Sequence, residues 1–319
     1  MKILAADIGN EHAELALLKI SIDGHRRELF RRAYQPQQFI SSRRLIEQFL
    51  SDADASTTLI ERLCISVAGV VDKDQCYMRP LQWQIDADQL SEQFYINDVS
   101  LISDFDAAAR GIDTTQTEDL ITLNEGIGLE RGIRVVTGAG HGLGMTWMDH
   151  TQNAFSNHKS SGGHVDFAPV DEEQIALLAH LMKRFNHVSY ERILSHEGLL
   201  ELYAYCQQHN EGARPDTSVT HIIQSAADDP AAAKALTLFA TTYGAYVGNL
   251  ALLYQPMGGI YIGGRVAAEL KPWMQSEHFL NACLKKGRMS KLVEQTPIYL
   301  VTSSAINLQG AIETASYRY

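Results

Sequence analysis

The chain has 319 residues, a formal net charge of −11 at pH 7, and a hydrophobic fraction of 45%. This length predicts two domains or one large α/β unit rather than a single small core. An acidic chain lacks the clustered positive charge that phosphate backbones require, which excludes a nucleic-acid surface. The first apolar run stops at Asp7, and the sequence contains no run of about 18 apolar residues, so neither export nor a membrane partner is expected.

The four cysteines are scattered, at positions 64, 76, 206 and 283, and none forms a CxxC pair. That pattern is typical of reduced thiols in a cytoplasmic protein, so cytoplasmic localisation is predicted. Four histidines at 150, 158, 164 and 187 lack the spacing of a zinc site.

The first hundred residues predict strands with crossing helices. A strand at 2–6 meets a turn at 7–10, and 13–22 is expected to return as its hairpin partner. The basic pairs at 26–27 and 31–32 are interpreted as solvated charges beside the turn at 23–25. Apolar residues of 41–51 share one helical face, and a strand at 63–67, a helix at 86–94 and a strand at 100–103 follow.

The second half repeats the opening pattern. A strand at 134–137 runs into a glycine-rich turn at 138–144, as the first strand runs into residues 7–10. This repetition predicts a duplicated architecture with a cleft between the halves. Later segments predict a helix from 171, a long helix from Asp229-Pro230, strands at 258–264 and 297–301, and a final helix at 307–317.

Asp104 follows the predicted strand at 100–103, at the strand end where α/β folds bind ligands. An aspartate at this place is either a general base toward a hydroxyl group or the N-cap of the next helix. The spacing alone does not decide between these roles.

Glycine turns supply the next candidates. Residues 138–142, Gly-Ala-Gly-His-Gly, offer backbone N–H groups that could cradle phosphate oxygens, although they match neither the Walker nor the dinucleotide pattern. A purely structural turn is about as good an interpretation. Asp7-Ile8-Gly9 has the same ambiguity, because Asx turns also produce it.

The stretch Gly162-Gly163-His164 suggests a polyol pocket, since glycines admit a ligand close to the backbone and histidine hydrogen-bonds hydroxyl groups. A structural histidine is the alternative interpretation. Glu191 offers further hydrogen bonds to hydroxyls. Its alternative is a solvated position on a helix, paired with Arg192.

Taken together, these segments resemble the bacterial ATP-dependent glucokinase family. The similarity covers nearly the whole chain, and residues 162–169, GGHVDFAP, and 191–195, ERILS, are its most specific stretches. The matching turns are Asp7-Ile8-Gly9, Gly138 to Gly144 and Gly263-Gly264. A related branch of sugar kinases has a cysteine-rich zinc motif after the histidine, and residues 165–169 here disfavour that branch.

The resemblance implies a duplicated ribonuclease-H-like fold of the actin-type ATPases, with two domains flanking a cleft. Residues 1–112 with 303–319 would form the small domain, rejoined by the C-terminal helix, and 113–302 the large one. The implied partners are ATP, Mg²⁺ and a hexose, with glucose first, and a homodimer is implied too.

The resemblance also implies a role for each matching residue. Asp104 is the catalytic base toward the sugar 6-hydroxyl, and Asp7 is the residue that holds Mg²⁺ through water. The implied sugar-binding residues are Ser103, Ser161, His164 and Glu191. The implied nucleotide-binding residues are Asp7, Ile8, Gly9, Gly138, Gly140, His141, Gly142, Gly263 and Gly264.

Several positions depart from the family pattern. The first phosphate loop continues as Asn10-Glu11-His12-Ala13-Glu14, which adds two carboxylates where phosphate would bind. Like charges about 4 Å apart repel by roughly 4 kcal/mol at an effective dielectric near 20, unless Mg²⁺ bound by a glutamate reverses the sign. Serines stand at 103 and 161, where the family has asparagine and glutamate, and His141 replaces a threonine.

Two functions from different classes follow. The first is a hexose kinase that transfers the γ-phosphate of ATP to the 6-hydroxyl of glucose or a similar sugar. The second is a catalytically impaired, glucokinase-like protein that binds a sugar or a partner and regulates. A kinase with another donor, or with an amino or acetylated sugar beside Ser161, is a third interpretation.

Overall fold

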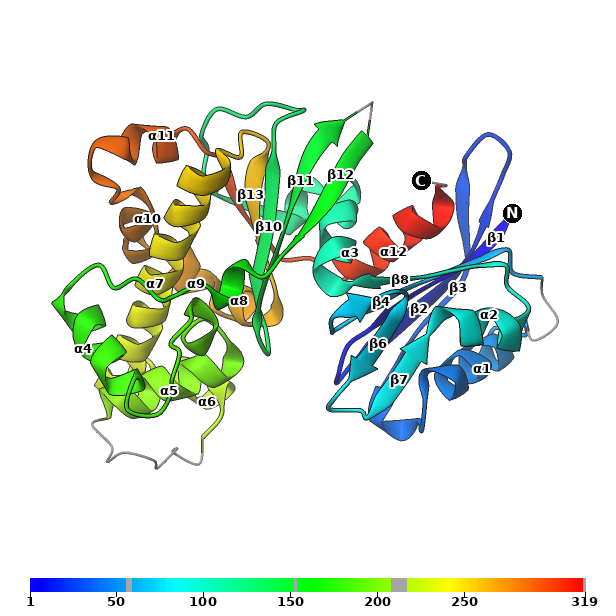
Figure 1. Cartoon of the computed structure of the whole chain (residues 1–319), viewed down its shortest axis with the longest axis horizontal. Helices are drawn as coiled ribbons and strands as arrows, with labels where there is room; N and C mark the ends of the chain where they lie inside the picture. The colour runs from blue at the N-terminus through cyan, green and yellow to red at the C-terminus, as the bar shows by residue number, and fades with distance from the viewer. Residues whose placement is uncertain (56–58, 152–153, 208–216, 318–319) are drawn as a thin grey trace. The chain divides into compact units, whose positions relative to one another are not determined.

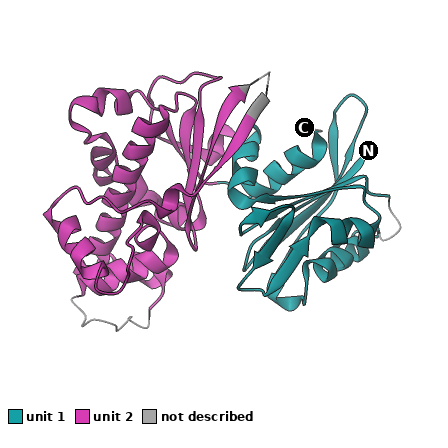
Figure 2. Ribbon diagram, in the orientation of Figure 1, with its two compact units in different colours: residues 1–115, 303–319 teal, residues 116–302 magenta. Residues whose placement is uncertain are grey.

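The computed structural model describes residues 1–55, 59–151, 154–207 and 217–317. These residues form two compact units (Figure 2). Unit 1 comprises Met1–Thr115 and Ser303–Tyr319, and unit 2 comprises Gln116–Thr302. Both ends of the chain therefore belong to the same unit.

Unit 1 is built on a five-stranded sheet with the order β3-β2-β1-β4-β8 (Figure 1). The strands are β1 (Lys2–Ile8), β2 (Ala13–Ile20), β3 (Arg26–Tyr34), β4 (Arg62–Val67) and β8 (Asp98–Ser103). β1 is antiparallel to β2 and parallel to β4, and its apolar residues are buried on both faces, as a central strand requires.

Helices cover both faces of this sheet. α1 (Ser42–Asp52) and α2 (Ala87–Phe94) contribute Leu45, Phe49 and Leu90 to the core on one face. α12 (Ile306–Ser316) contributes Leu308 and Ile312 to the core on the other face, and it packs along α3 (Asp104–Gly111). A small three-stranded sheet contains β5 (Val71–Asp72), β6 (Gln75–Met78) and β7 (Trp83–Asp86).

The basic pairs follow the predicted turn, and Arg27 and Arg32 are exposed as expected, whereas Arg26 and Arg31 are partly buried. Residues 26–34 form the edge strand β3, whose backbone pairs with β2. Arg31 pairs with Glu14 of β2, and Arg26 pairs with Glu313 of α12. From β3 these arginines neutralise carboxylates, and charged side chains on an edge strand also discourage pairing with another chain.

Unit 2 is built on a six-stranded sheet with the order β12-β11-β10-β13-β14-β9. The strands are β9 (Leu120–Asn124), β10 (Arg134–Ala139), β11 (Leu143–Thr151), β12 (Ala154–Ser160), β13 (Gly259–Gly263) and β14 (Ile298–Val301). β10 is antiparallel to β11 and parallel to β13, as β1 is to β2 and β4. The same order and directions in five strands of each sheet confirm the duplicated α/β fold.

Helices make up the rest of unit 2. They are α4 (Glu172–Leu181), α5 (His196–Cys206), α6 (Val219–Ser225), α7 (Pro230–Tyr254), α8 (Arg265–Glu269), α9 (Lys271–Met274), α10 (Glu277–Leu284) and α11 (Ser290–Glu294). The 3₁₀ turns are η1 (Pro36–Gln38), η2 (Ile112–Thr114) and η3 (Thr117–Asp119) before β9, and η4 (Gly162–His164), η5 (Tyr190–Arg192) and η6 (Gly287–Met289) after β12.

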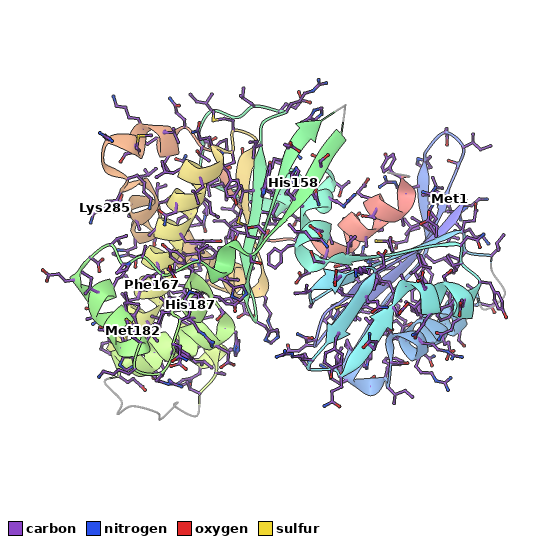
Figure 3. All side chains as sticks on the ribbon, in the orientation of Figure 1. Met1, His158, Phe167, Met182, His187 and Lys285 are labelled. Carbon is purple, nitrogen blue, oxygen red and sulfur yellow. The ribbon has the colours of Figure 1, made fainter. Side chains whose placement is uncertain are left out.

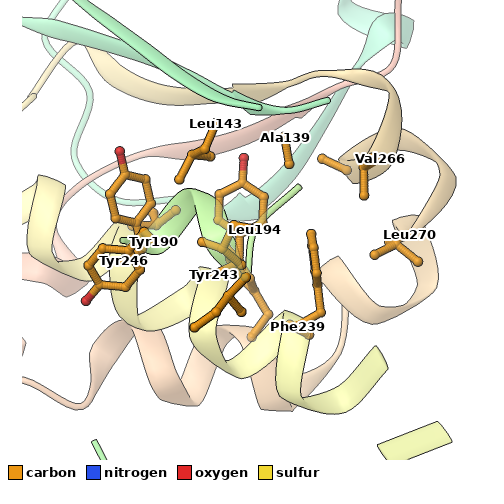
Figure 4. Packing of buried hydrophobic residues seen from close by; sticks show 14 of the residues in the cluster. Ala139, Leu143, Tyr190, Leu194, Phe239, Tyr243, Tyr246, Val266 and Leu270 are labelled. Carbon is orange, nitrogen blue, oxygen red and sulfur yellow. The ribbon is translucent and has the colours of Figure 1, made fainter. Parts of the chain in front are cut away.

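The long helix α7 is the centre of the core of unit 2. Its Tyr243 and Tyr246 are buried with Tyr190 and with Leu143 of β11 (Figure 4). Among the described residues it is the one helix long and apolar enough to cross a membrane, but 72% of its apolar window is buried inside the protein. Its composition is therefore that of a core helix.

Candidate functional site

In unit 1, the first candidate carboxylate lies at the end of β1. Asp7 Oδ1 accepts a hydrogen bond of 2.8 Å from the hydroxyl of Ser66, its register partner on β4. Burial raises the pKa of Asp7 to about 6, although hydrogen bonds from Ser66 and Asn307 act in the opposite direction. A carboxylate with this pKa gains from a nearby cation.

The second carboxylate follows β8. Ser103 is the N-cap of α3, since its hydroxyl accepts from the backbone N–H of Asp106 at 3.1 Å. Asp104 is therefore the first residue of the helix and not its cap, which removes one of the two interpretations of this residue. Burial, and then the negative charge of Asp7, raise the pKa of Asp104 to about 7. The charge of Asp7 thus acts on Asp104 within unit 1.

The turn between β1 and β2 is closed by a backbone hydrogen bond from Gly9 to the carbonyl of His12 at 2.9 Å. Glu14, the register partner of Asp7, is held by Arg31 of β3 through two hydrogen bonds of 2.8 and 3.0 Å. This pairing corrects the expectation that Glu14 adds an uncompensated charge to the phosphate loop, because a guanidinium neutralises it.

In unit 2, the corresponding turn joins β10 to β11. Gly138 lies beside Gly263 in the parallel pair of β10 and β13. The turn closes by a hydrogen bond from the N–H of Gly140 to the carbonyl of Gly142 at 2.8 Å. Gly264 has φ +88°, and a Cβ there would lie 2.5 Å from the carbonyl oxygen of Ala139. Only glycine fits this close approach of two backbones.

The segment after β12 lies against the start of β11. His164 ends the turn η4 with its side chain 62% exposed, which leaves the imidazole accessible to a ligand. A Cβ on Gly163 would lie 1.9 Å from the carbonyl oxygen of Leu143, so glycine is required there. The segment continues beside 187–190, where Phe167 donates its N–H to the carbonyl of Val188 at 2.9 Å (Figure 3).

Glu191 lies in the turn η5 and not in a regular helix, so the interpretation as a helix residue paired with Arg192 was wrong. Its Oε2 accepts from the backbone N–H of Leu143 at 2.9 Å, and its Oε1 lies 3.7 Å from Nδ1 of His164. Arg192 instead lies over the ring of Phe185, 4.3 Å from its centroid. Glu191 and His164 therefore lie side by side, with polar atoms close enough to contact one ligand.

The structure thus groups the predicted residues in two sets. Asp7, Ile8, Gly9, Ser103 and Asp104 belong to unit 1. The glycine turns, His141, Ser161, His164 and Glu191 belong to unit 2. Sequence reasoning missed residues that hold these sets in place, namely Ser66 and Asn307 beside Asp7 and Leu143 beside Glu191. Strand register reveals Ser66, but no local sequence signal reveals the backbone N–H of Leu143.

Asp7 and Asp104 are the carboxylates of unit 1 that could hold a metal ion. Among the residues that the structure describes, no three His, Cys, Asp or Glu side chains gather around one point. Asp7 and Asp104 nevertheless repel each other, and a divalent cation relieves such repulsion. They fit a Mg²⁺ ion that keeps water and phosphate oxygens as most of its ligands, as Mg²⁺ usually does.

Comparison with known proteins decides the family. The family model described as Glucokinase matches residues 4–317. The chain belongs to the glucokinase family. It is 31% identical to a glucokinase of Nostoc sp. over 97% of both chains, and 32% identical to that of Photorhabdus laumondii over 97% of this chain and 95% of the other.

A solved structure supports the assignment to the glucokinase family. The crystal structure of a glucokinase from an Antarctic psychrotroph superposes with a TM-score of 0.86 at 26% identity, over 98% of each chain. The resemblance seen in the sequence is thereby confirmed, and so is the actin-type ATPase fold that it implied.

Proposed function

We propose that the protein is a hexose kinase that transfers the γ-phosphate of ATP to the 6-hydroxyl of glucose. The observation that carries this proposal is the family match over residues 4–317, together with a base-like carboxylate at Asp104. The relatives that match over almost their whole length are glucokinases. These matches favour an active kinase over the catalytically impaired alternative.

In this proposal Asp104 is the general base. The oxygen of the 6-hydroxyl bonds to the γ-phosphorus, the bond from that phosphorus to the bridging oxygen of ADP breaks, and the hydroxyl proton passes to the Asp104 carboxylate. A pKa of about 7 leaves a large fraction of this carboxyl ionised at neutral pH, so it accepts a proton readily.

The residues of unit 2 bind and orient the substrates. His164 and Glu191 hydrogen-bond sugar hydroxyls, and their mutual distance of 3.7 Å suits two neighbouring hydroxyl groups. Ser161 is proposed to lie beside the sugar as well, and Ser103 of unit 1 is a further proposed sugar-binding residue. The backbone of Gly138, Gly140 and Gly142, with Gly263 and Gly264, is proposed to hold ATP phosphates, and a Cβ at Gly140 or Gly263 would meet no atom within 4 Å.

The metal ion, the oligomeric state and the cellular location are also part of the proposal. Mg²⁺ bound near Asp7 neutralises phosphate charge when it is present. Ile8 and Gly9 belong to the same nucleotide-binding turn, and His141 to its counterpart in unit 2. Units 1 and 2 are proposed to be the small and large domains. A homodimer in the cytoplasm is proposed as the working form.

The test is a coupled assay of ADP release with Mg-ATP and a panel of hexoses. We expect release with glucose, and a loss of about 10² to 10⁴-fold in the Asp104→Ala variant, because general-base catalysis has that size. Asp88→Asn, which changes an exposed carboxylate in the first turn of α2, is the matched control and is expected to behave as the original protein. Unchanged release in the Asp104→Ala variant contradicts the proposal.

A further inference from the structure

Glu191 is placed mainly by the backbone of another segment. Its carboxylate is bound to the N–H of Leu143, 48 residues earlier in the chain. Its own carbonyl accepts from the hydroxyl of Ser195 at 2.8 Å, and that hydroxyl also accepts from the N–H of Gly198. The main chain of Glu191 is thus fixed from the α5 side, and its side chain is fixed from the β10–β11 turn.

The neighbour of Leu143 limits where this carboxylate can lie. A Cβ on Gly142 would lie 2.5 Å from Oε2, 3.3 Å from Cδ and 4.0 Å from Cγ of Glu191. These three atoms are the nearest ones to that position, and all belong to one side chain. Because Gly142 has only a hydrogen atom in place of a side chain, the Glu191 carboxylate has room to accept the hydrogen bond from the Leu143 N–H.

The backbone of Gly142 does not itself require glycine, because its φ is outside the positive range where other glycines of this chain lie. Gly140, two residues earlier in the same turn, also has an ordinary φ, and a Cβ there would meet nothing within 4 Å. Of these two glycines, only Gly142 borders the space that Glu191 occupies.

We propose that Gly142 is a positioning residue for Glu191, which ties the sugar-binding carboxylate to the turn proposed to receive ATP phosphates. This inference rests on the proposed function, in which Glu191 binds the sugar. A methyl group at 142 would displace the carboxylate from the Leu143 N–H and from its place beside His164. The clash is with the far end of a flexible side chain, which can move while the backbone stays in place, so the fold is expected to survive while sugar binding suffers.

The experiment compares Gly142→Ala with Gly128→Ala, measuring glucose binding by calorimetry without nucleotide. We expect the dissociation constant of glucose to rise at least about tenfold in Gly142→Ala, since hydrogen bonds to a charged group are lost. Gly128 is exposed and lies outside the proposed binding turns, and a Cβ there would meet only Pro297 at 3.8 Å, so Gly128→Ala is expected to leave that constant unchanged. Equal constants for both variants and the original protein overturn the inference.

A double-mutant cycle isolates the contact. Aspartate is one methylene shorter, so in the Glu191→Asp background Gly142→Ala is expected to weaken glucose binding by less than about threefold further. An undiminished effect of Gly142→Ala in that background contradicts the inference. Should Gly142→Ala fail to fold, recovery of folding in the double variant supports the steric conflict, and its failure to recover overturns it.

A second readout does not depend on the sugar. The Leu143 amide has the Glu191 carboxylate as its acceptor, so its hydrogen exchange is expected to accelerate in Gly142→Ala and not in Gly128→Ala. Should the original protein bind no glucose, the proposed function fails, and the exchange of Leu143 still decides the positioning role. Unchanged exchange in Gly142→Ala overturns the inference.

Discussion

The β1–β2 hairpin of unit 1 and the β10–β11 hairpin of unit 2 occupy the same position in two sheets of the same strand order, but their turns differ chemically. The first carries carboxylates, Asp7 at the end of β1 and Glu14 on β2, with Arg31 as counter-charge. The second is a turn of backbone and glycine between Gly138 and Gly142.

This difference indicates a division of labour between the duplicated halves. A buried carboxylate pair with raised pKa values is suited to proton transfer and to binding a cation. Neutral N–H groups of a glycine turn are suited to phosphate oxygens, which carboxylates repel. In the proposed function, hairpins at the same place in the two sheets would thus carry different chemistry.

The largest effect that would test this division is expected at Gly264, which supports the second turn. Gly264→Ala forces alanine into a φ of +88° and brings its Cβ to 2.5 Å from the Ala139 carbonyl, so we expect the free energy of unfolding to fall by about 3 kcal/mol. The KM for ATP is expected to rise with it. Denaturant unfolding and steady-state kinetics measure the two effects.

Gly263→Ala is the matched control for Gly264→Ala. A Cβ at position 263 would meet nothing within 4 Å, so its effect on the free energy of unfolding is expected to stay within about 1 kcal/mol. Equal destabilisation by the two substitutions would show that close approach to Ala139 does not matter.

A smaller effect concerns pH and the carboxylate pair. The pKa values of Asp7 and Asp104, about 6 and about 7, are both raised from the ordinary 3.8. We expect kcat/KM to fall about tenfold for each pH unit below an apparent pKa near 7, because the base must be ionised. The apparent pKa belongs to the coupled pair. Asp7→Asn is expected to move this limb to lower pH by removing a negative charge, and an unmoved limb would contradict the coupling.

The pH dependence of the stability of the protein without ligands follows from the same two raised pKa values. Because the folded pKa values exceed the unfolded ones, the folded protein binds more protons between about pH 4 and 7, and this contribution to stability is lost as pH rises through 6 to 7. The Asp104→Asn variant lacks one of these two titrating carboxyl groups, so it loses less stability as the pH rises. The variant is therefore expected to gain stability relative to the original protein as pH rises, as thermal unfolding at pH 4.5 and 8 would measure.

The sequence predicted the central strands and the duplication, since buried apolar runs such as those around Leu4 and Val136 mark central strands, but it gave no strand order. It failed where long-range contacts decide. The edge strand β3 carries few apolar residues, and its Arg31 finds a partner only across the sheet. Glu191 follows no helical pattern because it is fixed by Leu143 and the turn at Gly142. Neither Glu14, the partner of Arg31, nor the Leu143 N–H, the partner of Glu191, can be inferred from sequence spacing.

The smallest expected effect concerns the counter-charge of the first hairpin. The Glu14–Arg31 pair is partly exposed, with side chains 22% and 29% accessible, so its electrostatic contribution is on the order of 1 kcal/mol. Arg31→Gln leaves the Glu14 charge uncompensated beside Asp7, and we expect the dissociation constant of Mg-ATP to rise about fivefold. Equilibrium binding at low and high salt measures this, since salt should reduce the difference.

The reciprocal variants test whether the charges of Glu14 and Arg31, rather than their packing, influence Mg-ATP binding. Glu14→Gln removes the hydrogen-bonded partner of the Arg31 guanidinium and leaves it only Glu28 at 3.9 Å, which is expected to tighten Mg-ATP binding by a few-fold. The double variant Glu14→Gln/Arg31→Gln should return close to the original value. If both single variants instead weaken binding equally, the pair serves only to hold β2 against β3. The charges of the first hairpin would then have no influence on phosphate, and the contrast between the two turns would reduce to Asp7 alone.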